Sequence, residues 1–320
     1  IGSGQSNMAG GVGGYAKRDE VLAKLAAGTY PQLRLCRGKG GTWQQSNPQT
    51  NQGFSALLFA FGQRLQKDLD VPVGLILGAV GGTPSGRWLT NEMLANDAQT
   101  KIFKAANGGD LYRQHILPVV PYGIRGVLWD QGESGTAIKG LDQFTTMGAL
   151  ISGWRDAWGQ GEFPFLYVQK PSGGGCAWDK SNPTTRMAED FAALPAAPQQ
   201  AGAGDYRAHH VRIRQHPGTA MVTARDLGSG VHPQNKSGYG HRAAQVALGF
   251  AYKQDGEIYG PMYASHEVGA DKIRIQFEHV GGGLATKYGD GLQGFAVAGK
   301  DGKYHWAKAV IDGDSVLVSS

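Results

Sequence analysis

Short apolar runs alternate with amphipathic segments through most of this chain, and this alternation restricts the possible fold more than any other feature. In residues 54–69 apolar side chains recur at spacings of three and four, as in a helix with one buried face. These side chains are Phe54, Leu57, Leu58, Phe61 and Leu65. Residues 71–77 follow as a nearly continuous apolar run, which is typical of a strand covered on both faces.

The same order of segments recurs further along the chain. Three more helices are predicted, at 111–120, 144–158 and 237–252. Three more strands are predicted, at 124–129, 163–168 and 219–224. Strands that alternate with helices form a parallel sheet with helices on both faces. The sequence therefore predicts an α/β fold of the three-layer α/β/α type, in which ligands bind outside the carboxyl ends of the strands.

The pattern changes near residue 258. Residues 272–277 alternate strictly between apolar and polar side chains, and residues 315–318 form a further short strand. Neither segment continues the α/β repeat. We therefore expect one α/β domain over residues 1–257 and a small C-terminal β appendage over residues 258–320 that packs on it.

Composition and charge exclude several classes of protein. The 320 residues are 41% apolar and 18% charged, as in globular proteins. The net charge of +5 comes without a block of Lys and Arg, which argues against a nucleic-acid partner. No apolar run approaches the ~18 residues of a membrane-spanning helix. The apolar Ile1 resembles the end of a strand, so we expect that the numbering starts on a mature or truncated product.

The cysteine and histidine patterns give no sign of a metal site. Cys36 and Cys176 are too few for a disulfide framework and too far apart for a CxxC metal site, so one disulfide and two thiols both stay open. The adjacent His209 and His210 cannot share one face of a helix or strand. No HExxH motif occurs. We expect neither a catalytic metal nor another cofactor.

Four turns rich in glycine and polar residues follow predicted strands. They span residues 4–8, 81–84, 131–134 and 226–233. Because the carboxyl ends of parallel strands lie at the same edge of a sheet, the four turns are expected to converge there.

The first and last turns supply a serine and a histidine. A serine hydroxyl needs a base within hydrogen-bond reach to become a nucleophile, and the base is usually histidine. Ser6 and His232 are therefore the predicted nucleophile and base. The backbone N–H groups of Ser6 and Gly82 and the side-chain amide of Gln131 are the predicted donors to the oxyanion that forms when an ester carbonyl is attacked.

The four turns together resemble the SGNH-hydrolase superfamily, and within it the sialate O-acetylesterase and acetylxylan esterase group. The matching blocks are GQSNM, GGTP with Trp88 beyond it, W-x-QGES, and VHPQNK followed by Arg242. The tail from residue 259 is similar to the C-terminal segment of sialate-O-acetylesterase-like proteins. The resemblance implies the flavodoxin-like SGNH fold and hydrolysis of acetyl esters on a glycan through an acetyl-enzyme.

One position departs from the family pattern. Many SGNH enzymes carry an aspartate three residues before the histidine, where this chain has Ser229. Three replacements stay open: Glu133 as the acid or as an orienting residue, Asp226 as an alternative acid, or a backbone carbonyl that supports a Ser–His dyad.

The substrate is predicted less closely than the chemistry. Gln5, Arg87 and Trp88 are the predicted substrate contacts. Sialic acid and xylan are the acetylated carbohydrates that the resemblance suggests, and the β tail favours the sialate branch. The alternatives are an acetylxylan esterase, a catalytically dead carbohydrate-binding protein on the same scaffold, and an acetyltransferase. The expected location is secreted or periplasmic.

Overall fold

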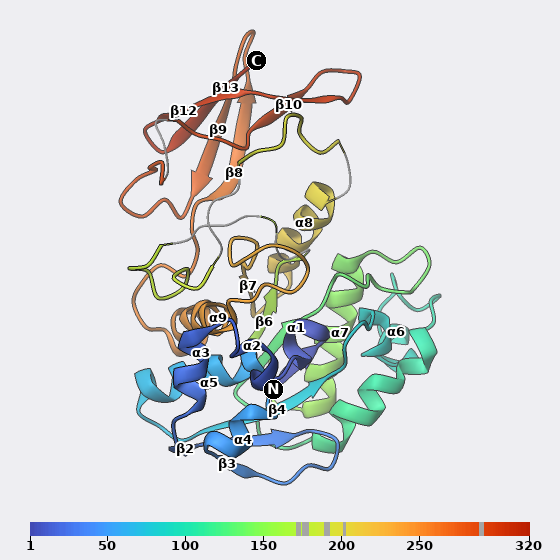
Figure 1. Cartoon of the computed structure of the whole chain (residues 1–320). Helices are drawn as coiled ribbons and strands as arrows, with labels where there is room; N and C mark the ends of the chain where they lie inside the picture. Colours follow the sequence, from blue (N-terminus) through green and yellow to red (C-terminus); the bar gives the residue numbers. More distant parts are fainter. Residues whose placement is uncertain (171–173, 175–178, 189–192, 201–202, 288–290) are drawn as a thin grey trace. The chain divides into compact units, whose positions relative to one another are not determined.

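The computed structural model of the protein describes residues 1–170, 174, 179–188, 193–200, 203–287 and 291–320 (Figure 1). Its contacts divide these residues into two compact units. The first unit holds the described residues within 1–191 and 203–253, and the second holds those within 192–202 and 254–320. The predicted boundary, between residues 257 and 258, lies a few residues later and leaves residues 193–200 in the first unit.

A seven-stranded sheet forms the centre of the first unit. Its strands are β1 (Gly2–Gly4), β2 (Tyr30–Arg37), β3 (Gln44–Ser46), β4 (Val73–Ala79), β5 (Val127–Asp130), β6 (Phe165–Val168) and β7 (Thr219–Val222). The spatial order is β3-β2-β4-β1-β5-β6-β7, and every pair is parallel except β2 and β3. The chain leaves β1 toward β2 on one side and later reaches β5 on the other. This reversal beside β1 is where doubly wound sheets bind ligands.

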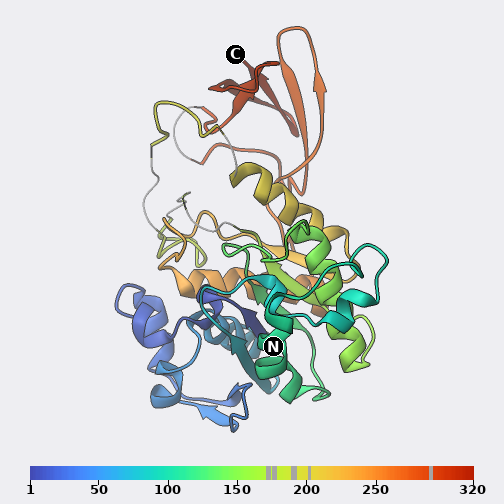
Figure 2. The same cartoon turned by 90° about the vertical axis from the view of Figure 1, so that its right-hand side faces the viewer.

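Helices cover both faces of this sheet. They are α1 (Ser6–Ala9), α2 (Val12–Tyr15), α3 (Glu20–Ala26), α4 (Pro48–Gln52), α5 (Ala56–Leu69), α6 (Asn91–Ala95), α7 (Gln143–Trp158), α8 (Ala203–Arg212) and α9 (Lys236–Tyr252). Short 3-10 turns lie at Ser85–Arg87, Ala106–Gly109 and Ile213–Gln215. Figure 1 shows α3, α5 and α9 on one side of the sheet and α6 and α7 on the other, and Figure 2 shows the same cartoon turned by 90° about the vertical axis. The predicted three-layer α/β/α fold is confirmed.

Two successive residues of β5 show why both faces are buried. Trp129 points toward α7. The centroid of its ring lies 5.9 Å from that of Trp154 on α7 and 5.8 Å from that of Trp88, and both contacts are edge to face. Asp130 points to the opposite face and accepts a hydrogen bond from Tyr239 of α9 at 2.5 Å. Because strand side chains alternate between faces, this one strand contacts both helical layers.

A glycine brings α5 and α9 close together on one face. A Cβ on Gly240 would lie 2.5 Å from the Cβ of Ala60, which no packed structure tolerates without movement. The missing side chain lets the two helix backbones approach.

Each predicted helix and strand has a counterpart in the structure except residues 111–120, whereas several observed elements, among them α3, α8 and β2, have no predicted counterpart. Residues 111–120 form no α-helix: a π-helical turn, Tyr112–Ile116, is followed by a 3-10 turn, Leu117–Val119. Pro118 lacks the N–H that an α-helix needs at that position. Strand β2 has no counterpart among the predicted elements, because Pro31, Gln32 and Arg34 interrupt any apolar run.

The second unit is an antiparallel β structure. Its four-stranded sheet has the order β12-β13-β9-β8, and β10 pairs with β11. The strands are β8 (Met262–Val268), β9 (Ile273–Glu278), β10 (Ala296–Ala298), β11 (Tyr304–Trp306), β12 (Lys308–Asp312) and β13 (Ser315–Ser319). Its core centres on Ala309, Val316 and Val318.

Hydrogen bonds explain why residues 193–200 belong to the second unit. Gln200 exchanges two hydrogen bonds with the backbone of Tyr304, at 2.9 and 2.7 Å. The indole of Trp306 donates to the carbonyl of Pro195 at 2.8 Å. Because these hydrogen bonds attach residues 193–200 to β11, this segment belongs to the second unit although about 100 residues separate the two in the sequence.

Within the described residues, no helix has both the length and the apolar character needed to cross a membrane.

Candidate active site

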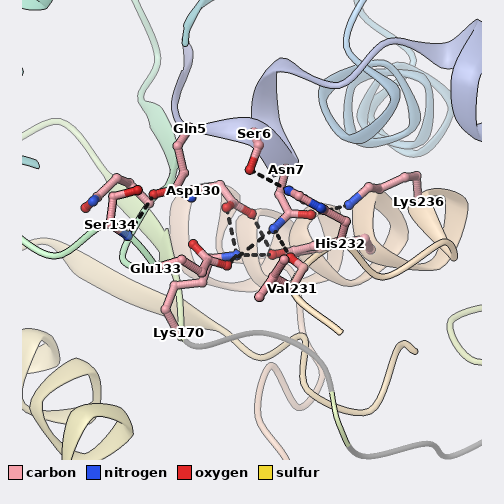
Figure 3. A network of polar contacts seen from close by, with 12 residues as sticks. Gln5, Ser6, Asn7, Asp130, Glu133, Ser134, Lys170, Val231, His232 and Lys236 are labelled. Atoms are coloured by element: carbon pink, nitrogen blue, oxygen red, sulfur yellow. Dashed lines mark hydrogen bonds and ion pairs between the residues drawn. The ribbon is translucent and has the colours of Figure 1, made fainter. Parts of the chain in front are cut away.

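The four predicted turns meet at the carboxyl edge of the sheet, where hydrogen bonds join them. Gln5 donates its backbone N–H to Asp130 at 2.7 Å, and Val80 donates to Gly4 at 3.0 Å. The side chain of Asn7 donates to the carbonyl of Val231 at 2.8 Å. The turns after β1, β4, β5 and β7 therefore form one connected site, and Figure 3 shows contacts among the turns after β1, β5 and β7.

Gly4 makes the sharp exit from β1 possible. Its φ of 119° is a conformation that side chains rarely adopt, and a Cβ there would lie 2.1 Å from the carbonyl oxygen of Asp130. Only glycine fits between β1 and β5 in this way. The turn ends with Ser6 as the first residue of α1.

Ser6 and His232 lie within hydrogen-bond distance although 226 residues separate them. The Nε2 of His232 is 2.8 Å from the Oγ of Ser6 (Figure 3). At this distance a neutral imidazole can accept the hydroxyl proton, the first requirement for a serine nucleophile. The pair is exposed to solvent, so a substrate can reach it.

The backbone N–H groups of Ser6 and Gly82 are the predicted oxyanion donors. Neither the N–H of Ser6 nor that of Gly82 donates to another residue within the described ranges. Gly82 has a φ of 69°, and a Cβ on its neighbour Gly81 would lie 3.7 Å from the Cβ of Ser6. The second turn therefore lies against the serine with donors available.

The side chain of Gln131 does not fit its predicted role as an oxyanion donor. Its Nε2 donates to the carbonyls of Thr83 at 3.2 Å and Gly135 at 2.9 Å, which uses both amide hydrogens. Its Oε1 accepts from Gln143 at 3.2 Å, and the residue is 1% exposed. Gln131 instead ties the second turn to the third.

Neither predicted acid is hydrogen-bonded to His232. Glu133 contacts Lys170 at 3.1 Å and Asn7 at 3.4 Å. Asp226 forms a two-pronged ion pair with Arg242 of α9, at 2.5 and 2.7 Å. In the part of the chain that the structure describes, no carboxylate reaches the imidazole.

The predicted substrate contacts need correction. Trp88 is fully buried, and its indole donates to Thr83 at 3.1 Å, so it is a core residue and not a pocket wall. Arg87 pairs with Asp110 at 2.9 and 2.5 Å, so its guanidinium is engaged by a neighbouring carboxylate. Gln5 is 3% exposed and accepts from the N–H of Ser134 at 3.3 Å, so it positions the third turn.

The remaining predictions concern cysteines and metals. Cys36 is a buried free thiol, and Cys176 lies outside the described residues. Among the described side chains, no group of three or more His, Cys, Asp or Glu is arranged to hold a metal ion.

Comparison with known proteins identifies the family. The sequence model of the family described as carbohydrate esterase, sialic acid-specific acetylesterase, matches residues 1–232. The chain belongs to this family. The matched region covers the first three turns and ends at His232, within the fourth.

Individual relatives agree with this assignment. Human sialate O-acetylesterase and that of Pongo abelii are each 27% identical over 241 residues, covering 68% of this chain and 43% of theirs. The chain thus spans less than half the length of these relatives. The crystal structure of a carbohydrate acetylesterase from Xanthomonas citri superposes with a TM-score of 0.82 at 26% identity, covering all of this chain and 71% of that one.

This acetylesterase-family chain has a buried charge network beneath Ser6 that sequence reasoning missed. Lys170 is fully buried and contacts Asp130 at 2.8 Å, Glu133 at 3.1 Å and the hydroxyl of Tyr239 at 3.1 Å. Two carboxylates and one phenol oxygen therefore lie around its ammonium group. The hydroxyl of Tyr239 donates to Asp130, and burial beside this carboxylate raises the pKa of Tyr239 well above its ordinary value.

A second buried lysine lies in the same region. Lys236, the first residue of α9, donates to the Oδ1 of Asn7 at 2.5 Å and lies over the rings of Tyr15 and Tyr239. Burial lowers its pKa from 10.5 to about 7, although Asp130 opposes the shift. A lysine two residues after a strand and another after His-Pro-Gln-Asn were the available sequence signals, but buried lysines are too rare for either to be decisive.

Lys236 makes stability depend on pH. Between its folded pKa of about 7 and its ordinary value of 10.5, the unfolded chain binds more protons than the folded chain. The free energy of unfolding therefore rises with pH in this window, by about 2 kcal/mol from pH 7 to 9. Urea titrations of the wild type and Lys236→Met at both pH values should show this rise only in the wild type. Parallel changes in the two proteins would contradict it.

Proposed function

We propose that the protein is a carbohydrate O-acetylesterase, similar to sialate O-acetylesterases, that acts through an acetyl-enzyme on Ser6. The observation that carries the proposal is the distance of 2.8 Å between the Oγ of Ser6 and the Nε2 of His232, beside two unused backbone donors. Membership of the sialic acid-specific acetylesterase family supports the substrate class.

The geometry fits a two-step acyl transfer. The Oγ of Ser6 attacks the acetyl carbon while the Nε2 of His232 takes the hydroxyl proton. The electron pair of the carbonyl π bond moves onto the carbonyl oxygen, which becomes negatively charged. The N–H groups of Ser6 and Gly82 stabilise this oxyanion, each by about 2.7 to 4 kcal/mol. When the intermediate collapses, the ester bond to the sugar breaks, and the sugar oxygen takes the proton from His232.

The second step regenerates the enzyme. Water gives a proton to His232 and attacks the acetyl-enzyme, so that the bond to Ser6 breaks and acetate forms. The Oγ of Ser6 then recovers the proton from His232. No group besides the serine, the imidazole and the two N–H groups is needed to balance these steps.

A substrate screen tests the function. Acetate release should be measured on O-acetylated sialic acid, acetylated xylan and a simple acetylated monosaccharide. We expect the highest kcat/KM on the sialic acid. Preference for xylan would identify an acetylxylan esterase, and acetate release on none of them would favour a carbohydrate-binding protein. A location outside the cytoplasm, secreted or periplasmic, stays a prediction from this substrate class.

We expect a dyad without a carboxylate partner, because neither acid is hydrogen-bonded to the imidazole. Glu133→Gln and Asp226→Asn should each lower kcat by no more than about tenfold, whereas loss of a triad carboxylate costs about 10⁴-fold. The kcat of each variant on an acetyl ester checks this expectation. A 10⁴-fold loss in one variant alone would identify that residue as the acid.

A further inference from the structure

Asn7 links the nucleophile turn to the loop that carries His232. It directly follows Ser6 and is fully buried. Its Nδ2 donates to the carbonyl of Val231 at 2.8 Å, and its Oδ1 accepts from Lys236 at 2.5 Å. Figure 3 shows Asn7 between Lys236 and the segment of Val231 and His232.

The two partners determine which way the carboxamide of Asn7 points. The amine of Lys236 donates a hydrogen bond here, and the backbone carbonyl of Val231 can only accept one. The oxygen of Asn7 must therefore face Lys236, and the nitrogen must face Val231. Glu133, which accepts from the same nitrogen at 3.4 Å, favours the same orientation.

The loop around His232 needs such a link. Residues 229–232 are exposed, and no carboxylate within the described ranges holds the imidazole. The bond from Asn7 fixes the carbonyl of Val231, the residue directly before His232. Gln234 gives a second contact, to the carbonyl of His232 at 3.2 Å, but this contact is exposed to water.

We propose that Asn7, oriented by Lys236, is a positioning residue that holds His232 at hydrogen-bond distance from Ser6. The inference rests on the proposed function, because it assigns Asn7 a part in the reaction of that pair. Asn7 takes over the task of fixing the histidine that a triad carboxylate has in other serine hydrolases, but it acts through the backbone and not through the Nδ1 of the imidazole.

The test replaces Asn7 by aspartate. A carboxylate has the same size and still accepts from Lys236, but it has no donor for Val231 and repels that carbonyl. Misplacement of a catalytic group by about 1 Å costs about 10²-fold in rate. Asn7→Asp should therefore lower kcat for acetate release by about 100-fold and leave KM within about twofold.

Asn51 provides a matched control. It is also fully buried, and its Nδ2 donates to the carbonyls of Ala26 at 3.1 Å and Gly28 at 3.2 Å. Asn51→Asp makes the same chemical change at a position on α4 that contacts neither Ser6 nor His232. It should lower the thermal midpoint and leave kcat unchanged. Equal losses of kcat in both variants would overturn the proposal, because they would reflect general destabilisation.

A spectroscopic readout separates this proposal from the proposed function. The ¹⁵N signal of His232 Nε2 reports its hydrogen bond to Ser6 and requires no catalysis. It should shift in Asn7→Asp and stay unchanged in Asn51→Asp. If the wild type releases no acetate, the proposed function fails. The ¹⁵N signal then still tests whether Asn7 positions His232.

Lys236→Met is the second variant, used if Asn7→Asp does not fold. It leaves the oxygen of Asn7 without its donor, so the same ¹⁵N shift and a smaller loss of kcat are expected. An unchanged His232 signal in whichever variant folds would overturn the positioning role.

Discussion

Ser6→Ala should abolish the burst of p-nitrophenol from p-nitrophenyl acetate and lower kcat by about 10⁵ to 10⁶-fold. The alanine has no oxygen at the position that lies 2.8 Å from His232, so no acetyl-enzyme can form. Stopped-flow absorbance measures the burst, and released acetate measures kcat.

His232→Ala serves as the companion variant for this prediction. Because serine and histidine act as a unit, its loss of kcat should match that of Ser6→Ala, and the double variant should lose little more. Circular dichroism should show an intact fold, since His232 lies at the surface. A burst that persists in Ser6→Ala would remove the serine from the mechanism.

Lys170→Met should lower the free energy of unfolding by about 3 to 5 kcal/mol. The ammonium contacts Asp130 and Glu133, and Lys170 and Asp130 are fully buried. Methionine fills a similar volume but leaves the carboxylates without their cation, and an uncompensated buried charge is costly. Urea denaturation measured by fluorescence gives the difference.

Two further variants make the Lys170 result specific. Arg113→Met removes a cation from an exposed ion pair with Glu92, at 3.7 Å, and should cost less than about 1 kcal/mol. Adding Asp130→Asn to Lys170→Met removes one stranded charge and should recover part of the loss. A cost for Lys170→Met as small as that for Arg113→Met would mean that the network contributes little to stability.

The sequence alone predicted the architecture of the first unit and the serine–histidine pair. Apolar periodicity depends on which faces are buried, so α5, α7, α9 and the strands between them could be read from spacing. Ser6 and His232 could be found because each lies in a turn after a predicted strand, and parallel strands bring such turns to one edge.

The tertiary structure decided which polar groups face the substrate and which hold the site together. Gln131 and Trp88 have the chemistry of site residues, but their amide and indole groups are used by neighbouring turns. Arg87 is engaged by Asp110, which lies 23 positions away in the sequence. The spacing of residues predicts which turn carries a side chain. The hydrogen-bond partners of that side chain depend on contacts between segments that are distant in the sequence.

The buried charge network is the clearest case of a feature that the sequence does not predict. Lys170 and Lys236 look like ordinary surface lysines in the sequence, and their burial follows only from the packing of α9 against the strands that precede them. A buried charge is stable only when its partners are assembled around it. Those partners come from β1, β5, β6 and α9 or the residues next to them, and only the folded chain brings them together beneath Ser6.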